Sequence, residues 1–263
     1  MIEDEQPKRP RGIYLLPNLF TTAALFSGFY AIVAAIHGHF ESAAIAVFIA
    51  MVMDGLDGRV ARLTNTSSAF GAEYDSLADM VSFGLAPALI MYEWALRHMA
   101  TLGWAPAKLG WLAAFIYTAG AALRLARFNV QLGSVDKRYF IGLPSPSAAA
   151  IMVGLVWVGN DLEVLGKQWL WLAFVVTIGA GLLMVSNFLY YSFKQIDLKG
   201  RVPFAVPLAV VLAFVLLSIN PPRMLFTVFL LYGLSGPALW LFRQRQRLKR
   251  RQQGRDDASP PNA

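Results

Sequence analysis

Four aspartates lie within stretches that are otherwise apolar: Asp54, Asp57, Asp75 and Asp79. The members of the first pair are three residues apart and those of the second are four apart, so each pair occupies one face of a helix. Converging carboxylates repel one another unless cations neutralise them. Carboxylate oxygens without clustered His or Cys favour Mg²⁺, Mn²⁺ or Ca²⁺ over zinc. We therefore predict a site for two divalent ions, an arrangement suited to phosphoryl chemistry.

The alternative is that the aspartates form ion pairs with Arg59 and Arg62, but two cations do not balance four anions. Three residues with small side chains lie near the aspartates in sequence: Gly58, Ala61 and Gly71. Such positions let a ligand approach the backbone, or they let two membrane helices pack closely. Ligand access is favoured at Gly58 and Ala61, and both interpretations stay open at Gly71.

The composition indicates an integral membrane protein. Of 263 residues, 57% are hydrophobic and only 15% are charged, which exceeds what the core of a soluble domain needs. The chain contains no cysteine, which excludes disulfides, thiolate catalysis and thiolate metal sites. Spanning about 30 Å of hydrocarbon takes about 20 apolar helical residues.

We expect an all-α, polytopic bundle of about eight transmembrane helices, at residues 14–36, 41–63, 70–96, 107–128, 145–160, 168–192, 203–219 and 223–242. The domain plan is a basic N-terminus (1–13), a membrane domain (14–242) and a basic, partly disordered tail (243–263). The tail either binds anionic headgroups or serves as a flank that fixes orientation. No nucleic-acid partner is expected.

Charge placement predicts the orientation of the bundle. With eight spans, both termini lie on one side, and of the 23 basic residues only Arg97, Lys108, Lys167 and Arg223 fall on the other. Lys and Arg accumulate in cytoplasmic loops. Both termini and the ends of the helices that carry the aspartates are therefore predicted to be cytoplasmic.

The string from Asp54 to Asp79, with Asp57, Gly58, Ala61, Arg62, Gly71 and Asp75 at fixed spacing, resembles the signature of the CDP-alcohol phosphotransferase family. The resemblance implies that the four aspartates bind two divalent ions, Mg²⁺ or Mn²⁺. It also implies that Asp79 is the general base and that Gly58, Ala61 and Arg62 bind the CDP group of a CDP-lipid. Members are typically homodimers, so a homodimer is expected.

Three further segments resemble the bacterial phosphatidylserine synthases of that family: Pro17 to Thr21, Ser76 to Pro87, and Arg124 to Asn129 together with Gly142 to Pro146. This resemblance implies CDP-diacylglycerol as donor, L-serine as acceptor, and a bacterial inner membrane location. Asn18 is a candidate for phosphate binding or helix packing, and Gly71 for CDP-lipid binding.

The acceptor serine carries a carboxylate, which paired arginines can hold. Arg124 and Arg127 are three residues apart on one helix face, although flanking charge that fixes topology is an equally simple explanation. Asn129 and Ser145 are further candidates for acceptor binding, or else helix caps. Rival acceptors are glycerol 3-phosphate, inositol phosphate and choline. A rival of another class is a cation transporter lined by the aspartates.

Overall fold

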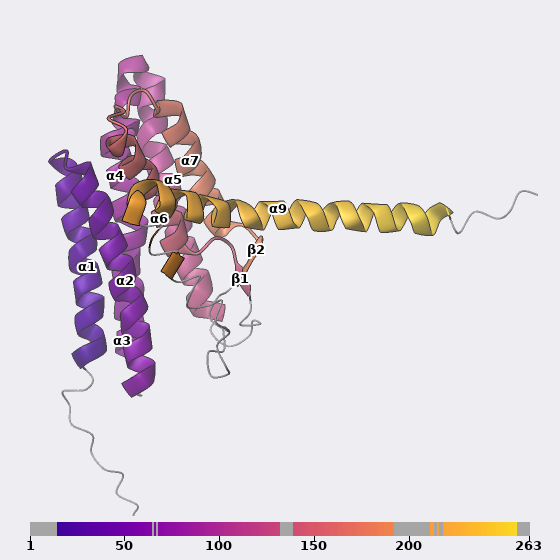
Figure 1. Ribbon diagram of the computed structural model, residues 1–263, viewed down its shortest axis with the longest axis horizontal. Helices are drawn as coiled ribbons and strands as arrows, with labels where there is room; N and C mark the ends of the chain where they lie inside the picture. The colour runs from indigo at the N-terminus through magenta and orange to yellow at the C-terminus, as the bar shows by residue number, and fades with distance from the viewer. Residues whose placement is uncertain are drawn as a thin grey trace, which may run out of the picture.

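The computed structural model describes residues 15–64, 66, 68–131, 139–191, 211–212, 215 and 218–256. These residues are mostly helical, as predicted, and most of the helices run side by side (Figure 1). The α-helices are α1 (Leu15–Ile36), α2 (Phe40–Thr64), α3 (Ala69–Asp79), α4 (Ala86–Trp94), α5 (Trp104–Gln131), α6 (Ser145–Asp161), α7 (Leu170–Val185) and α9 (Pro221–Asp256). Two short strands, β1 (Tyr139–Ile141) and β2 (Leu189–Tyr191), pair antiparallel.

Helices α1 and α2 form a closely packed hairpin. Their facing surfaces bury small side chains, including Ala24, Ala31, Ala43 and Ala50. Small residues let membrane helices approach closely, so dispersion contacts accumulate along the whole hairpin. Because α1 also packs against α3, it lies beside both helices that carry the aspartates.

The third predicted span is one continuous run of helix with a change of geometry in its middle. A π-helical turn, Met80–Leu85, follows Asp79 directly and leads into α4. Pro87 stands in the first turn of α4 and has no N–H to give to the carbonyl of Phe83, four residues earlier. The hydroxyl of the fully buried Tyr117 donates to that carbonyl at 2.9 Å, so α5 supplies a donor to the irregular turn.

Tyr117→Phe is expected to lower the free energy of unfolding by about 1–3 kcal/mol, because it removes the donor and leaves a buried carbonyl poorly satisfied. Thermal unfolding of the detergent-solubilised protein measures the change. Tyr30→Phe is the matched control, since Tyr30 is 48% exposed on α1 and its loss of a hydroxyl should leave stability unchanged. Equal stability of the Tyr117 variant and this control would contradict the prediction.

The second half of the bundle is built around α6, most of whose residues are buried. Helices α5 and α7 approach closely where Gly120 meets Gly181, since a Cβ on Gly120 would lie 2.6 Å from the Gly181 carbonyl oxygen. Gly142, which follows β1, packs against the carbonyl of Met184 near the end of α7, and its positive φ of 81° favours glycine. The amide of Gly142 donates to the carbonyl of Phe188 at 2.8 Å.

Three described helices are long and apolar enough to cross a membrane: Leu16–Ile36, Trp104–Val130 and Pro221–Phe242. Helix α2 is also long, but its second half carries two of the aspartates, Asp54 and Asp57, and two arginines. The predicted third span changes from α-helical to π-helical geometry in its middle, and α6 and α7 are short, with 17 and 16 residues. Most of the predicted span at 203–219 lies outside the described residues.

Helix α9 lies across the other helices instead of beside them, and its second half projects away from the bundle (Figure 1). Its first half packs on α6 and the ribbon. The hydroxyl of Tyr190 in β2 donates to the carbonyl of Gly233 at 2.9 Å, and Tyr232 donates to the carbonyl of Tyr191 at 3.1 Å. The predicted helical fold and integral membrane character are confirmed, whereas the count of eight spans stays a prediction.

Candidate active site

Three of the four aspartates converge between the second half of α2 and the middle of α3. One carboxylate oxygen from each of Asp54, Asp57 and Asp75 lies within 4.8 Å of the others. Hard divalent cations bind oxygens at about 2.0–2.6 Å, so two ligands of one ion lie within about 5 Å of each other. The donor type and the spacing therefore fit a divalent metal ion, and Asp57 is only 5% exposed.

Asp79 lies beside this cluster, one turn beyond Asp75 on α3. Its carboxylate lies close enough to interact electrostatically with Asp54, Asp75 and Arg124. The position next to the π-helical turn is notable because such turns are frequent at functional sites. Asp79 thus connects the carboxylate cluster to a basic side chain from α5.

Arg124 links Asp79 to α6. Its guanidinium donates to the hydroxyl of Ser145 at 2.6 Å, and it interacts electrostatically with Asp79 and Asp54. Ser145 is fully buried in the first turn of α6. Two residues that the sequence suggested for acceptor binding are therefore joined, and one of them, Arg124, interacts with the candidate general base.

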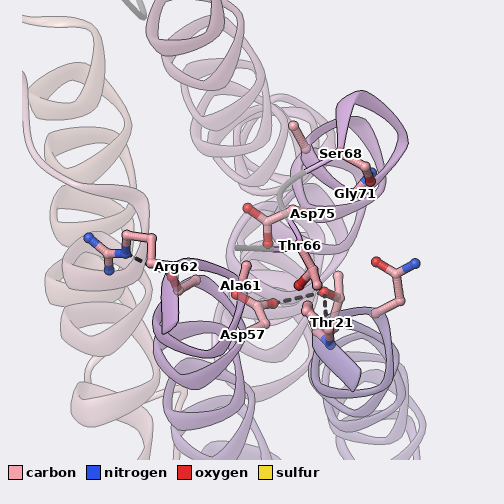
Figure 2. Close-up of a pocket in the computed structure, with 12 residues that line it drawn as sticks. Thr21, Asp57, Ala61, Arg62, Thr66, Ser68, Gly71 and Asp75 are labelled. Carbon is pink, nitrogen blue, oxygen red and sulfur yellow. Dashed lines mark hydrogen bonds between the residues drawn. The ribbon is translucent and has the colours of Figure 1, made fainter. Parts of the chain in front are cut away.

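A pocket of about 190 Å³ opens beside the carboxylates, between α1, α2 and α3 (Figure 2). It contains every residue that the sequence suggested for CDP-lipid binding. The lining residues are Pro17, Asn18, Thr21, Asp57, Gly58, Ala61, Arg62, Thr66, Ser68, Gly71, Ala72 and Asp75. The two metal-ligand candidates Asp57 and Asp75 thus share one cavity with the small residues of the signature.

The small residues in this pocket differ in their surroundings. A Cβ built on Gly58 would meet no heavy atom within 4 Å, so this glycine keeps space open and does not serve close helix packing. At Gly71 a Cβ would lie 3.1 Å from the Ser68 hydroxyl and 3.5 Å from the Asn18 side-chain oxygen. Gly58 therefore fits ligand access, and Gly71 fits the close approach of α1 to α3.

Arg62 lines the pocket but directs its charge elsewhere. Its Nε donates to the carbonyl of Gly58 at 2.8 Å, and Figure 2 shows the guanidinium pointing away from Asp57 and Asp75. The side chain is exposed. Its guanidinium therefore has to rotate before the charge can contact a ligand in the pocket.

The other two acceptor candidates make contacts that stabilise the fold. Arg127 donates to the carbonyls of Val185 and Ser186 at 3.4 and 3.5 Å and to the Asn187 side chain at 3.1 Å. Carbonyls at a helix C-terminus lack partners within the helix, and a basic side chain satisfies them. Asn129 on α5 donates to the Ser76 hydroxyl on α3 at 3.0 Å.

Sequence reasoning missed three polar residues of the pocket. Thr21 donates to the carboxylate of Asp57 at 2.8 Å, Ser68 caps the N-terminus of α3, and Thr66 is 5% exposed. A Ser followed by helix-forming residues is a recognisable cap signal. Nothing local in the sequence indicates that Thr21 on the first helix faces Asp57 on the second.

Comparison with known proteins identifies the family of the chain. The profile of the family described as CDP-alcohol phosphatidyltransferase matches residues 14–179. A CDP-diacylglycerol–serine O-phosphatidyltransferase from Helicobacter pylori is 39% identical, over 88% of this chain and 92% of that protein. A protein of the same name from Mycobacterium tuberculosis is 36% identical, over 69% of this chain and 63% of that protein. Another from Bacillus subtilis is 32% identical, over 68% of this chain and 92% of that protein. The chain belongs to the CDP-alcohol phosphatidyltransferase family.

Proposed function

We propose that this protein transfers a phosphatidyl group from CDP-diacylglycerol to the hydroxyl of L-serine, giving phosphatidylserine and CMP. The observation that carries the proposal is the 39% identity, over 88% of the chain, to a relative named for that reaction. The carboxylate cluster and the adjoining pocket supply groups suited to the chemistry.

The proposed cofactors are two Mg²⁺ or Mn²⁺ ions, held by Asp54, Asp57 and Asp75 with Asp79 as the fourth ligand. Bound ions would neutralise the diphosphate and stabilise CMP as it leaves. The CDP group is proposed to occupy the pocket lined by Asn18, Gly58, Ala61 and Gly71, with Arg62 turning inward. Support comes from the shared cavity and from the open space at Gly58.

In the proposed reaction, Asp79 takes the proton from the serine hydroxyl, and the serine oxygen attacks the phosphorus attached to the lipid. A new phosphorus–oxygen bond forms to serine, and the bond to CMP breaks with its electron pair leaving on CMP. Arg124 is proposed to hold the serine carboxylate, positioned by its hydrogen bond to Ser145. The contacts of Arg127 and Asn129 make their proposed acceptor role indirect, through the positions of α5, α7 and α3.

The lipid donor has to reach the site from the bilayer. Leu63 and Phe70, which adjoin the pocket residues Arg62 and Gly71 in sequence, are 84% and 70% exposed. In a membrane these apolar side chains contact lipid, so acyl chains can remain in the bilayer while the headgroup enters the pocket. The soluble acceptor then approaches from the aqueous side.

The proposed setting is the inner membrane of a bacterium, as a homodimer with eight spans, and with the active site and both termini in the cytoplasm. The proposed plan has a basic N-terminus (1–13), a membrane domain (14–242) and a basic tail (243–263). The distribution of Lys and Arg supports this orientation.

Because the chain has no cysteine, single-cysteine labelling can test the orientation directly. Thr101→Cys, between α4 and α5, is expected to react with a membrane-impermeant maleimide on intact spheroplasts. Ser259→Cys, in the tail, is expected to react only after the membrane is opened. The reverse pattern would contradict the proposed orientation.

The activity itself is tested with purified protein, CDP-diacylglycerol and Mn²⁺ or Mg²⁺. Serine, glycerol 3-phosphate, inositol phosphate and choline are offered separately, and CMP and lipid products are measured. Serine-dependent formation of phosphatidylserine supports the proposal, whereas product with another acceptor would keep the chemistry and change the substrate. Cation flux in liposomes, with no transfer to any acceptor, would favour a transporter.

A further inference from the structure

Thr21 is a buried hydroxyl that contacts the carboxylate cluster from outside the family signature. It lies on α1, is 3% exposed, and lines the pocket. Its Oγ1 donates to Oδ2 of Asp57 at 2.8 Å, and Figure 2 shows this bond between the first and second helices. Residues 36 positions apart in sequence are thereby held together at the candidate metal site.

A threonine within a helix ordinarily bonds to the carbonyl four residues earlier. Thr22 does so, donating to Asn18 at 2.7 Å. The Thr21 hydroxyl also lies near the corresponding carbonyl, that of Pro17. The distance from Oγ1 to this carbonyl oxygen is 3.2 Å, longer than the 2.8 Å to the Asp57 carboxylate. A hydroxyl has one proton, so the shorter contact marks the carboxylate as its main acceptor.

A hydrogen bond to one oxygen of a carboxylate restricts the rotation of the whole group. Asp57 is itself buried, and its ligand oxygen lies within 4.8 Å of those of Asp54 and Asp75. Outer residues that orient a ligand in this way typically change metal affinity by about 10–100-fold when they are replaced. Thr21 meets the geometric requirements for that role.

We propose that Thr21 is a positioning residue, whose hydroxyl holds the Asp57 carboxylate in the orientation that binds a divalent cation. The inference rests on the proposed function in one respect, since it takes the carboxylate cluster as the metal site. It adds α1, which carries no residue of the signature, to the parts of the chain that determine metal affinity.

The test is the affinity of the full-length, detergent-solubilised protein for Mn²⁺, measured without CDP-lipid by titration calorimetry or by electron paramagnetic resonance of free Mn²⁺. Thr21→Val keeps the side-chain shape and removes the hydroxyl, and it is expected to weaken Mn²⁺ binding by about 10–100-fold. Thr21→Ser keeps the hydroxyl and should restore most of the affinity. Thr21→Ala carries the same expectation as Thr21→Val if the valine variant does not fold.

Thr22→Val is the matched control. It removes a neighbouring hydroxyl on the same helix, which contacts the Tyr74 hydroxyl at 3.0 Å instead of a carboxylate. Its Mn²⁺ affinity should equal that of the unaltered protein. The inference is overturned if Thr21→Val binds Mn²⁺ as tightly as the unaltered protein, or if Thr21→Ser binds as weakly as Thr21→Val. Absence of Mn²⁺ binding by the unaltered protein would instead contradict the proposed metal site.

Discussion

Asp79→Asn is expected to lower kcat for transfer to serine by about 10²–10⁴-fold, the usual contribution of a general base. The amide keeps the size of the side chain but cannot accept the proton of the serine hydroxyl. Asp54, Asp57 and Asp75 still supply three carboxylates within 4.8 Å of one another, so binding of one Mn²⁺ is expected to persist, while loss of the fourth ligand weakens binding of the second ion. The measurements are CMP release at saturating substrates and Mn²⁺ affinity on the same preparation.

Glu73→Gln is the matched control for this prediction. Glu73 is an exposed carboxylate on α3, two residues before Asp75, and it is absent from the residues that line the pocket. Its neutralisation changes the charge of the same helix by the same amount, yet kcat should stay close to that of the unaltered protein. An equal loss of kcat in both variants would mean that the charge of the helix matters instead of proton transfer. A fully active Asp79→Asn variant would contradict the proposed role of Asp79 as general base.

The convergence of Asp54, Asp57 and Asp75 was predictable because it depends on local rules. Spacings of three and four residues place each pair on one helix face, and a short connection makes α2 and α3 neighbours. The observed bounds of α1, α2, α5 and α6 lie within a few residues of the predicted ones, since apolar runs ended by polar or Pro and Gly residues define such helices. These features require no knowledge of how distant helices pack.

The contacts that the sequence could not indicate are those between helices far apart in the chain. Tyr117 reaches the Phe83 carbonyl and Thr21 reaches Asp57 only because α5 and α1 pack where they do. The β1–β2 ribbon was missed for a similar reason, since strands of three residues have no periodicity to recognise, and the predicted span 168–192 included β2. The crosswise path of α9 likewise depends on packing against α6, which hydropathy does not report.

Arg124 and Arg127 show the same limit within one helix turn. The sequence offers two arginines three residues apart and no reason to separate their roles. In the structure Arg124 faces Asp79 and Ser145, whereas Arg127 faces the C-terminal end of α7. The first therefore adjoins the proposed reaction, and the second joins α5 to α7.

Arg124→Gln is consequently expected to raise KM for serine by about 10–100-fold, because a hydrogen bond to a charged group contributes about 1.5–3 kcal/mol. KM for CDP-diacylglycerol should change little, since Arg124 is not among the residues of the pocket proposed to hold the CDP group.

Arg127→Gln should instead lower the unfolding temperature and leave KM for serine nearly unchanged, because it exposes the α7 carbonyls without touching the acceptor. Both constants come from initial rates of CMP release, with unfolding followed in the same detergent. If both variants raised KM for serine equally, the two arginines would act together on the acceptor carboxylate, and a purely structural role for Arg127 would be contradicted.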